Sequence, residues 1–393
     1  MDRRPLNVVI PVRGGSKGIP KKNVAVVGGC PLIAWTVAAA VGATSVDRVI
    51  VSTDSAEIAA VARLYGGPRV EIHARSAESA TDTASSESAL LEAVRDLEVE
   101  GAVALVQATS PLLSSGVVDE IADRLSTHDS ALTVVRRHQF LWADEDAEGR
   151  PVNYSPDARP RRQDWSGHLI ETGAVYATSV ERLLASGVRI GGRVGLVETD
   201  EAEAVEIDSP TDLVVTDALL RTHRIRPAKV RSGPVRLVVT DVDGVLTDNG
   251  LTYGTVATET KTFSARDGKG FQLLREAGVR TALLTSEDHE SVAERARKLR
   301  VDDCVMGSTD KLADLVMLGA RYGVPLSQIA YVGDDVHDVP ALVAAGVSGA
   351  PGDARPEATD VADHVVTAAG GSGAFRQFTD HLFARSIPVR GGV

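Results

Sequence analysis

The sequence predicts an α/β protein of two domains, each a mostly parallel sheet flanked by helices. Three observations lead to this prediction. The chain has 393 residues, more than one hydrophobic core usually organises. Short runs rich in valine and isoleucine alternate with helical segments in both halves. Polar side chains follow several of these runs, at the strand ends where open parallel sheets bind their ligands.

The composition describes an ordinary globular chain and limits its partners. Hydrophobic residues make up 43% and charged residues 24%, and the net charge is -12 at pH 7. This balance makes nucleic acids and anionic membranes poor general partners. No stretch approaches the roughly 20 apolar residues of a membrane span. Two distant cysteines, Cys30 and Cys304, and an N-terminus without a signal-peptide core lead us to expect a cytoplasmic protein.

The first domain is predicted to span 1–223 and to open with a buried strand at 6–12. The loop at 13–23 then contains three glycines and four cationic side chains. Glycines let backbone N–H groups approach phosphate oxygens, and the cations offset triphosphate charge. The loop matches neither the Walker loop nor GxGxxG, and a solvated basic turn is the alternative. Its place at the first strand-to-helix crossing favours a phosphate site.

The alternation continues through the rest of this domain. Helices are predicted at 31–42, from 55 onward, up to about 97, and at 210–222, and strands at 48–54, 70–74, 102–109, 131–136 and 171–176. Residues 138–168 are predicted to form an irregular arm that holds a partner subunit or covers substrate. Glu206 and Asp208 lie two apart on an extended stretch and are expected to face one site. The alternative is a pair of surface carboxylates.

Residues 224–234 are basic, contain prolines and are predicted to be a solvated linker. The second domain, 235–393, opens with a buried strand that delivers Asp241 and Asp243 at its carboxyl end. An extended backbone would point both carboxylates to the same side. A nucleophilic carboxylate beside an acid/base carboxylate is what phosphoryl transfer to aspartate requires. The alternative is an Asx turn at the strand end.

Three further pieces follow at about the spacing of βα units. A strand at 279–286 ends in the hydroxyls of Thr285 and Ser286, which suit a phosphate oxygen. Lys311 opens the helical stretch 310–322, where an ammonium neutralises phosphate charge. A strand at 329–335 ends in carboxylates that include Asp334, and carboxylates from two strand ends suit Mg²⁺. His337, which follows, is expected to pack or hydrogen-bond rather than to catalyse.

The ordered set DxDGVLTD, LLTS, Lys311 and GDDVHD resembles the haloacid dehalogenase-like phosphatases over about 235–385. It is most similar to the small-cap branch, which acts on phosphorylated nine- and eight-carbon keto-sugar acids such as 3-deoxy-octulosonate 8-phosphate. The resemblance implies a Rossmann-like sheet with a minimal hairpin cap near 251–265. It implies catalytic roles for Asp241, Asp243, Lys311 and Thr285, and Mg²⁺ held by Asp241, Asp243 and Asp334. Small-cap relatives close their sites by oligomerising, which implies a homo-oligomer, commonly a tetramer.

The first domain resembles the CMP-sialic acid synthetases (acylneuraminate cytidylyltransferases) over about 6–220. The motifs IPVRGGSKGIPKKN, VSTD, ATDTASS, QATSPL, ETGAVY and EIDSPTDL occur in the order of that family. The resemblance implies a Rossmann-like nucleotidyltransferase fold, catalytic cations Arg13 and Lys22, and Mg²⁺ held by Glu206 and Asp208. It implies a CTP and sugar site formed by Arg13, Gly14, Gly15, Ser16, Lys17, Lys22, Asn23, Arg75, Ser85 and Gln107. Glu206 stands where the family commonly has aspartate.

Together these resemblances imply a bifunctional enzyme. It would dephosphorylate a sialate 9-phosphate and then couple the freed nine-carbon keto-sugar acid to CMP from CTP. One alternative is another acceptor: 3-deoxy-octulosonate, a deaminated sialate or a phosphonate. A second alternative makes the C-terminal domain only an oligomerisation scaffold, against which the intact set Asp241, Asp243, Lys311 and Asp334 argues.

Overall fold

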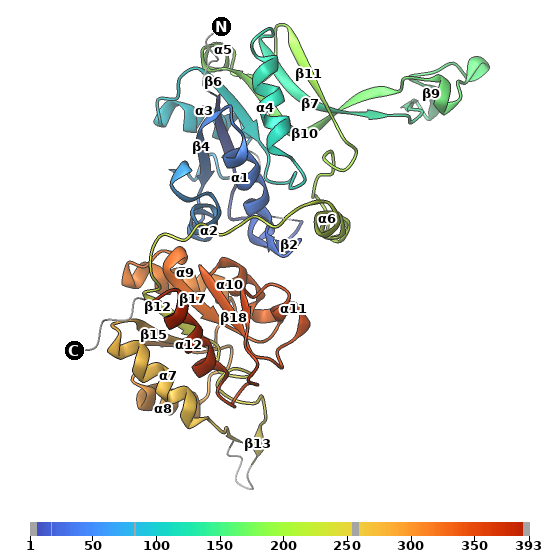
Figure 1. Ribbon diagram of the computed structural model, residues 1–393. Helices are drawn as coiled ribbons and strands as arrows, with labels where there is room; N and C mark the ends of the chain where they lie inside the picture. Colours follow the sequence, from blue (N-terminus) through green and yellow to red (C-terminus); the bar gives the residue numbers. More distant parts are fainter. Residues whose placement is uncertain (1–5, 17, 82–83, 254–258, 388–393) are drawn as a thin grey trace.

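The computed structural model describes residues 6–16, 18–81, 84–253 and 259–387, and within these ranges the chain folds around two separate sheets (Figure 1). In the described residues, the first half forms a seven-stranded sheet of order β11-β7-β10-β6-β1-β4-β5. The second half forms a six-stranded sheet of order β16-β15-β12-β17-β18-β19. The predicted fold class, two α/β domains with mostly parallel sheets, is confirmed.

The first sheet is parallel except at β10, which runs antiparallel to β6 and β7. The interior strand β1 contributes to cores on both faces, because Val8 and Ile10 pack on one side and Val9 on the other. Its strands are β1 (Leu6–Pro11), β4 (Val46–Thr53), β5 (Val70–Ala74), β6 (Ala102–Val106), β7 (Ser130–Arg137), β10 (His168–Ser179) and β11 (Val194–Thr199). Its helices are α1 (Leu32–Gly42), α2 (Ala56–Gly66), α3 (Ser86–Asp96), α4 (Ser115–Arg124), α5 (Val180–Ser186) and α6 (Pro210–His223).

The second sheet is parallel throughout the described residues. Its strands are β12 (Leu237–Thr240), β15 (Arg280–Leu284), β16 (Asp303–Val305), β17 (Ile329–Val332), β18 (Val347–Ala350) and β19 (His364–Val365). Its helices are α7 (Ala265–Glu276), α8 (Glu290–Leu299), α9 (Lys311–Tyr322), α10 (Val339–Ala344), α11 (Pro356–Thr359) and α12 (Ala374–Arg385). The short strands β13 (Thr252–Tyr253) and β14 (Glu259–Thr260) pair antiparallel as the expected hairpin, whose connection lies outside the described residues.

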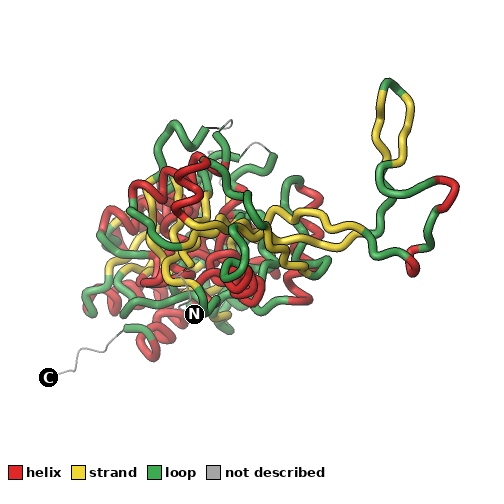
Figure 2. The backbone as a smooth tube through the Cα atoms, turned by 90° about the horizontal axis from the view of Figure 1, so that it is seen from above, coloured by secondary structure: helices red, strands yellow, loops and turns green. Residues whose placement is uncertain are grey.

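The arm at 138–168 projects from the first domain, as Figures 1 and 2 show. It is more regular than predicted, because β8 (Trp142–Glu145) and β9 (Glu148–Pro151) pair as an antiparallel hairpin. An aromatic cluster supports its base: the rings of Phe140 and Trp165 stack with centroids 5.0 Å apart. Trp142 remains 56% exposed.

Two segments in the first domain differ from what the sequence suggested. The stretch 204–208, which was expected to be extended, forms no strand. The strand that pairs with β7 at the sheet edge is instead β11, in which buried and exposed residues alternate. An edge strand of this kind has a weak hydrophobic signal because only one of its faces is buried.

The segment 224–234 joins the domains without helix or strand, and most of its residues are exposed, but some of its side chains are bound to the second domain. The Lys229 ammonium donates to the Leu342 carbonyl at 3.1 Å and to Asp363 Oδ2 at 3.0 Å. One continuous hydrophobic cluster includes Tyr65 of the first domain and Leu342 of the second. The two domains therefore share an apolar interface that the basic segment borders.

Within the described ranges, no helix combines the length and the apolar character required to cross a bilayer. Cys30 and Cys304 are both free thiols.

Candidate active sites

The first candidate site is a pocket of about 220 Å³ where β1 and β6 end. Seven residues of the predicted nucleotide site line it: Arg13, Gly15, Ser16, Lys22, Asn23, Arg75 and Gln107. They come from the loop after β1, from the end of β5 and from the end of β6. Parallel strands bring these loops together because their carboxyl ends share one edge of the sheet.

The loop at 13–23 is held open by hydrogen bonds to its backbone. The Asn23 amide donates to the Arg13 carbonyl at 3.0 Å, so the two ends of the loop are tied together. The Gly14 N–H donates to Asp54 Oδ1 at 2.7 Å, across to the end of β4. These two hydrogen bonds set the shape of the loop and involve neither the Arg13 guanidinium nor the Lys22 ammonium.

Two other predicted nucleotide residues have different positions. Gly14 lines an adjoining cavity of about 370 Å³ rather than the pocket itself. The hydroxyl of Ser85 accepts the Ser88 N–H at 3.1 Å and caps α3, while its neighbour Ser86 lines the pocket. Lys17 lies outside the described residues.

Glu206 and Asp208 lie beside this pocket and flank Lys22. The Lys22 ammonium donates to the intervening Ile207 carbonyl at 2.9 Å and lies 3.6 Å from Asp208 Oδ1. Glu206 Oε1 accepts the Thr109 hydroxyl at 2.9 Å. Burial raises the pKa of Glu206, and the Asp208 carboxylate adds to that shift. Two carboxylates and a lysine therefore meet at the pocket edge.

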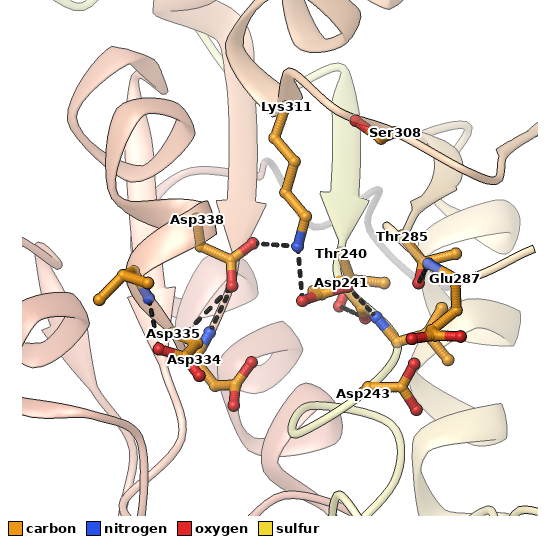
Figure 3. Close-up of polar contacts among 12 residues, drawn as sticks. Thr240, Asp241, Asp243, Thr285, Glu287, Ser308, Lys311, Asp334, Asp335 and Asp338 are labelled. Carbon is orange, nitrogen blue, oxygen red and sulfur yellow. Dashed lines mark hydrogen bonds and ion pairs between the residues drawn. The ribbon is translucent and has the colours of Figure 1, made fainter. Parts of the chain in front are cut away.

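The second candidate site is a pocket of about 330 Å³ at the carboxyl ends of β12, β15 and β17. The predicted catalytic residues Asp241, Asp243, Thr285 and Lys311 line it, as does the predicted metal ligand Asp334. Figure 3 shows the Lys311 ammonium between the carboxylates of Asp241 and Asp338. A larger cavity, of about 960 Å³, lies at the opposite end of the first sheet beside Leu6 and Ser179 and contains none of the predicted site residues.

Lys311 organises the floor of the second pocket. Its ammonium donates to Asp241 Oδ2 at 2.6 Å and to Asp338 Oδ1 at 2.7 Å, and the whole residue is 5% exposed. The Val242 N–H donates to Asp241 Oδ1 at 2.7 Å. Burial and the nearby Asp338 carboxylate raise the pKa of Asp241 well above its ordinary value, and the Lys311 ammonium opposes this shift.

Asp334 faces the same space from the end of β17. Burial raises its pKa to about 7, and the neighbouring Asp338 carboxylate adds to the shift. Gly244 has a φ of +77°, and a Cβ added there would lie 1.9 Å from Asp334 Oδ2. The turn after Asp243 therefore requires glycine both for its conformation and for the close approach of this carboxylate.

Asp243 lines the pocket but has a separate cationic partner. The Lys261 ammonium donates to both Asp243 carboxylate oxygens at 2.8 Å. Thr285 is 1% exposed, and its hydroxyl accepts the Glu287 N–H at 3.1 Å. His337, which was expected to pack or hydrogen-bond rather than to catalyse, is exposed and lines the pocket.

The residues present fit a divalent cation in the second pocket. Six carboxylates line it against the two lysines, so a phosphate group would meet net negative charge without a metal. Oxygens of Asp241, Asp334 and Asp338 lie within 4.8 Å of one another. Asp338 already accepts Lys311, Tyr331 and two backbone N–H groups, which leaves Asp241 and Asp334 as the better ligands. The Asp243 carboxylate faces Lys261 instead.

Several residues of these sites were not predicted from the sequence. Lys261 follows the hairpin strand β14, and no motif spacing pointed to it. Asn249, which donates to Asp334 Oδ2 at 3.2 Å, is another. No site role was predicted for Thr109, although it lies within the QATSPL motif. Asp338 is the last residue of the GDDVHD motif, and its position four residues after Asp334 could have indicated a role in the site.

Comparison with known proteins gives matches to both halves. A family model described as cytidylyltransferase matches residues 7–213, and one described as haloacid dehalogenase-like hydrolase matches residues 264–346. N-acylneuraminate cytidylyltransferase A of Danio rerio is 34% identical over 387 residues, covering 96% of this chain and 89% of that protein. The N-acylneuraminate cytidylyltransferase of Oncorhynchus mykiss is 32% identical, covering 97% and 89%. The 3-deoxy-D-manno-octulosonate 8-phosphate phosphatase of Haemophilus influenzae is 38% identical over 148 residues, covering 38% of this chain and 82% of that protein.

Proposed function

Because the chain belongs to the N-acylneuraminate cytidylyltransferase family and carries a haloacid dehalogenase-like hydrolase domain, we propose that it is a bifunctional enzyme. The N-terminal domain transfers CMP from CTP to a sialic acid and releases pyrophosphate. The C-terminal domain hydrolyses a sugar-acid phosphate of the sialate 9-phosphate type. The two steps are consecutive, since hydrolysis frees the acid that is then coupled to CMP.

The observation that carries the transferase proposal is the pocket formed by the 13–23 loop. Arg13 and Lys22 line it, and Lys22 lies 3.6 Å from Asp208 of the Glu206 and Asp208 pair. The anomeric hydroxyl of a 2-keto sugar acid is a hindered nucleophile toward the α-phosphorus of CTP. Catalysis then consists mainly of positioning and of neutralising charge on the transferring group. Arg13 and Lys22 supply fixed positive charge, and the glycine-rich backbone supplies N–H donors.

Glu206 and Asp208 would hold Mg²⁺ in this domain. Glu206 is partly buried with one oxygen held by Thr109, whereas the Asp208 side chain is 72% exposed. Oxygen ligands of this kind suit Mg²⁺, which completes its shell with water and substrate phosphates. The ion would supply charge neutralisation at the phosphates.

The observation that carries the hydrolase proposal is the Lys311 ammonium 2.6 Å from Asp241. We take Asp241 as the nucleophile: an oxygen of its carboxylate attacks phosphorus, the P–O bond to the sugar breaks, and Asp243, protonated at the start of this step, gives its proton to the departing oxygen. Asp243 then removes a proton from water, which attacks the phosphorus of the aspartyl phosphate and restores Asp241. Lys311 and the Thr285 hydroxyl stabilise the oxygens of the transferring phosphoryl group.

Asp241 and Asp334 would hold Mg²⁺ in the hydrolase pocket. When bound, the ion would offset the charge of the six carboxylates and of the phosphate. A direct test is calorimetric titration of Mg²⁺ into the wild-type protein and into Asp334→Asn. Equal affinity in the two proteins would place the ion elsewhere.

Another acidic acceptor is the main alternative. The Haemophilus influenzae relative is named for 3-deoxy-D-manno-octulosonate 8-phosphate, an eight-carbon acid, and it matches only the C-terminal part. Pyrophosphate release from CTP is therefore to be measured with a sialic acid, a deaminated sialate, 3-deoxy-octulosonate and a phosphonate. Release with the eight-carbon acid or the phosphonate alone would reject the sialate assignment and leave cytidylyl transfer intact.

The C-terminal domain as a pure scaffold is the second alternative. The buried assembly of Asp241, Lys311 and Asp338 argues against it. Burying three charged groups costs desolvation free energy, and a pure scaffold would have no need for such a cluster. Phosphate release from a sialate 9-phosphate by wild-type protein decides the question. No release with any sugar-acid phosphate would support the scaffold.

We also propose a homo-oligomer, with a tetramer formed through the hydrolase domain. The hairpin β13–β14 is too small to cover the hydrolase pocket by itself, and Tyr253 on it is 70% exposed. Trp142 on the arm is another large exposed apolar residue. Light scattering on the full chain would give the mass, and a monomer at assay concentration would exclude the proposal.

A further inference from the structure

The two candidate sites are joined by one side chain at the domain interface. Lys21 belongs to the nucleotide loop and has a φ of +50°, which sends it and the neighbouring Lys22 in different directions. Lys22 reaches Ile207 beside the first pocket. Lys21 spans the domain interface. Its ammonium donates to both oxygens of Glu57 in its own domain, at 2.9 and 2.8 Å, and to Asp310 Oδ2 of the hydrolase domain.

Asp310 stands directly before Lys311. Its second carboxylate oxygen accepts the Ala313 N–H at 3.1 Å and caps the first turn of α9. Lys311, the first residue of that helix, holds Asp241 and Asp338. A continuous series of contacts therefore runs from the nucleotide loop through Lys21 and Asp310 to the floor of the hydrolase pocket.

Helices α2 and α9, on the two sides of this series of contacts, pack against each other. Glu57 lies in the first turn of α2, which packs against α9 across the interface (Figure 1). Tyr65 at the other end of α2 donates to the Val343 carbonyl at 2.9 Å. Because α2 is anchored at both ends, a change at Lys21 is transmitted to α9 rather than absorbed by a loose interface.

Lys21 also lies next to the first pocket. It lines the cavity of about 370 Å³ that shares Asn23 with the first pocket. A triphosphate in that loop competes with Glu57 and Asp310 for the Lys21 ammonium, because all three are anions. A ligand shifts an equilibrium only through such differential contacts.

We propose that Lys21 is a positioning residue for both reactions, holding α9 and its Lys311 in register when the nucleotide loop is empty and releasing them when CTP binds. This inference rests on the proposed function in taking CTP and phosphate as ligands of the two pockets. Because binding linkage is reciprocal, a phosphate analogue in the hydrolase pocket changes the affinity for CTP by the same factor.

The first measurement uses the full chain with Mg²⁺ and follows CTP binding by calorimetry, with and without orthovanadate. In wild type, vanadate changes the Kd for CTP by about fivefold or more. In Lys21→Met the change is lost, and in Lys21→Arg, which keeps the charge, it is largely retained. Lys269→Met, an exposed lysine on α7, behaves as wild type. An equal vanadate effect in wild type and Lys21→Met, or no effect in a wild-type protein that binds vanadate, would overturn the proposal.

The second measurement is hydrogen exchange at the first turn of α9, which needs no catalytic turnover. CTP is expected to speed exchange of the Ala313 amide in wild type, and Lys21→Met is expected to show the fast exchange without CTP. Unchanged exchange in wild type with bound CTP would refute the coupling even if vanadate did not bind. Failure to bind vanadate would instead count against the proposed hydrolase, so the two failures are distinguishable.

Discussion

Lys261 donates to both carboxylate oxygens of Asp243 at 2.8 Å, and its side chain is only 1% exposed. The hairpin β13–β14 lies between these two residues in the chain, so the cap and the pocket floor meet through this ion pair. The Thr247 hydroxyl adds a third hydrogen bond, at 3.3 Å to Asp243 Oδ1. Lys261 thereby fixes the direction in which the Asp243 carboxylate faces the pocket.

Replacing Lys261 by methionine tests that role. We expect phosphate release to fall by about 10-fold or more, because a misdirected acid/base group loses much of the 10²–10⁴-fold contribution of proton transfer. Lys261→Arg is expected to recover part of the rate, and Lys269→Met serves as the matched exposed control. Unchanged phosphate release in Lys261→Met would show that Asp243 does not depend on this pair.

The two chemistries are expected to be separable at Asp241. Asn at this position keeps the size of the side chain but removes the attacking charge, so phosphate release should drop on the order of 10³-fold or more. Cytidylyl transfer, measured at saturating CTP without a hydrolase ligand, should stay within about twofold, because Asp241 does not line the first pocket and the Lys21 contacts with Glu57 and Asp310 are left in place. Both products are measured in the same preparation. Retained phosphatase activity would reject Asp241 as the nucleophile.

Arg13 and Lys22 are expected to carry the transferase. Removing either cation should slow pyrophosphate release by about 10²-fold or more, if it stabilises charge on the transferring phosphate. Phosphate release from the hydrolase domain provides the internal control for folding. Normal turnover in Arg13→Ala would place the triphosphate elsewhere.

Gly244 gives a test of the cradle around Asp334. An alanine Cβ at this position would lie 1.9 Å from Asp334 Oδ2, and the φ of +77° is strained for alanine. Gly244→Ala is therefore expected to weaken Mg²⁺ binding and to destabilise the fold by more than about 1 kcal/mol. The control is Gly323→Ala, which has a similar φ of +61° but no atom within 4 Å of its Cβ. Equal effects in the two variants, by calorimetry and denaturant unfolding, would refute a specific clash.

His381 predicts a pH dependence of stability. Its ring stacks on His364 with centroids 3.8 Å apart, and burial lowers its pKa, as do the charges of His364, Arg385 and Arg231. A lowered folded pKa means that the neutral form is favoured. The stabilisation is therefore present above about pH 6.5 and is lost as the pH falls through the folded pKa. Between pH values of about 7.5 and 5.5, Tm should fall more in wild type than in His381→Gln. Identical pH profiles would contradict this assignment.

The polar groups at the strand ends show what local pattern predicts well. Asp241 and Asp334 follow hydrophobic strands, Lys311 opens a helix between them in the chain, and parallel strands must bring their carboxyl ends to one edge. The 13–23 loop was identified for the same reason, since glycines and cations after a first buried strand have few other uses. In these places the fold follows from periodicity and the site follows from the fold.

The arm, the edge strand β11 and the stretch 204–208 show where such reasoning fails. Half-exposed strands have a weak hydrophobic pattern, and no strand was predicted at β11 for this reason. The alternating residues at 204–208 predicted an extended stretch, but this stretch pairs with no neighbouring strand. Whether an alternating segment becomes a strand depends on a free sheet edge, which is a property of the assembled domain.

The sequence by itself determined the two α/β domains, their order and the residues at the ends of their central strands, because periodicity and motif spacing are local. Only the tertiary structure decided that Lys261 meets Asp243, that Lys21 meets Asp310 and that the basic segment 224–234 lies along a shared apolar interface. These pairs lie 18 and 289 residues apart in the chain. The sequence around a charged residue does not identify its ion-pair partner, because packing of the surrounding hydrophobic surfaces brings the two residues together.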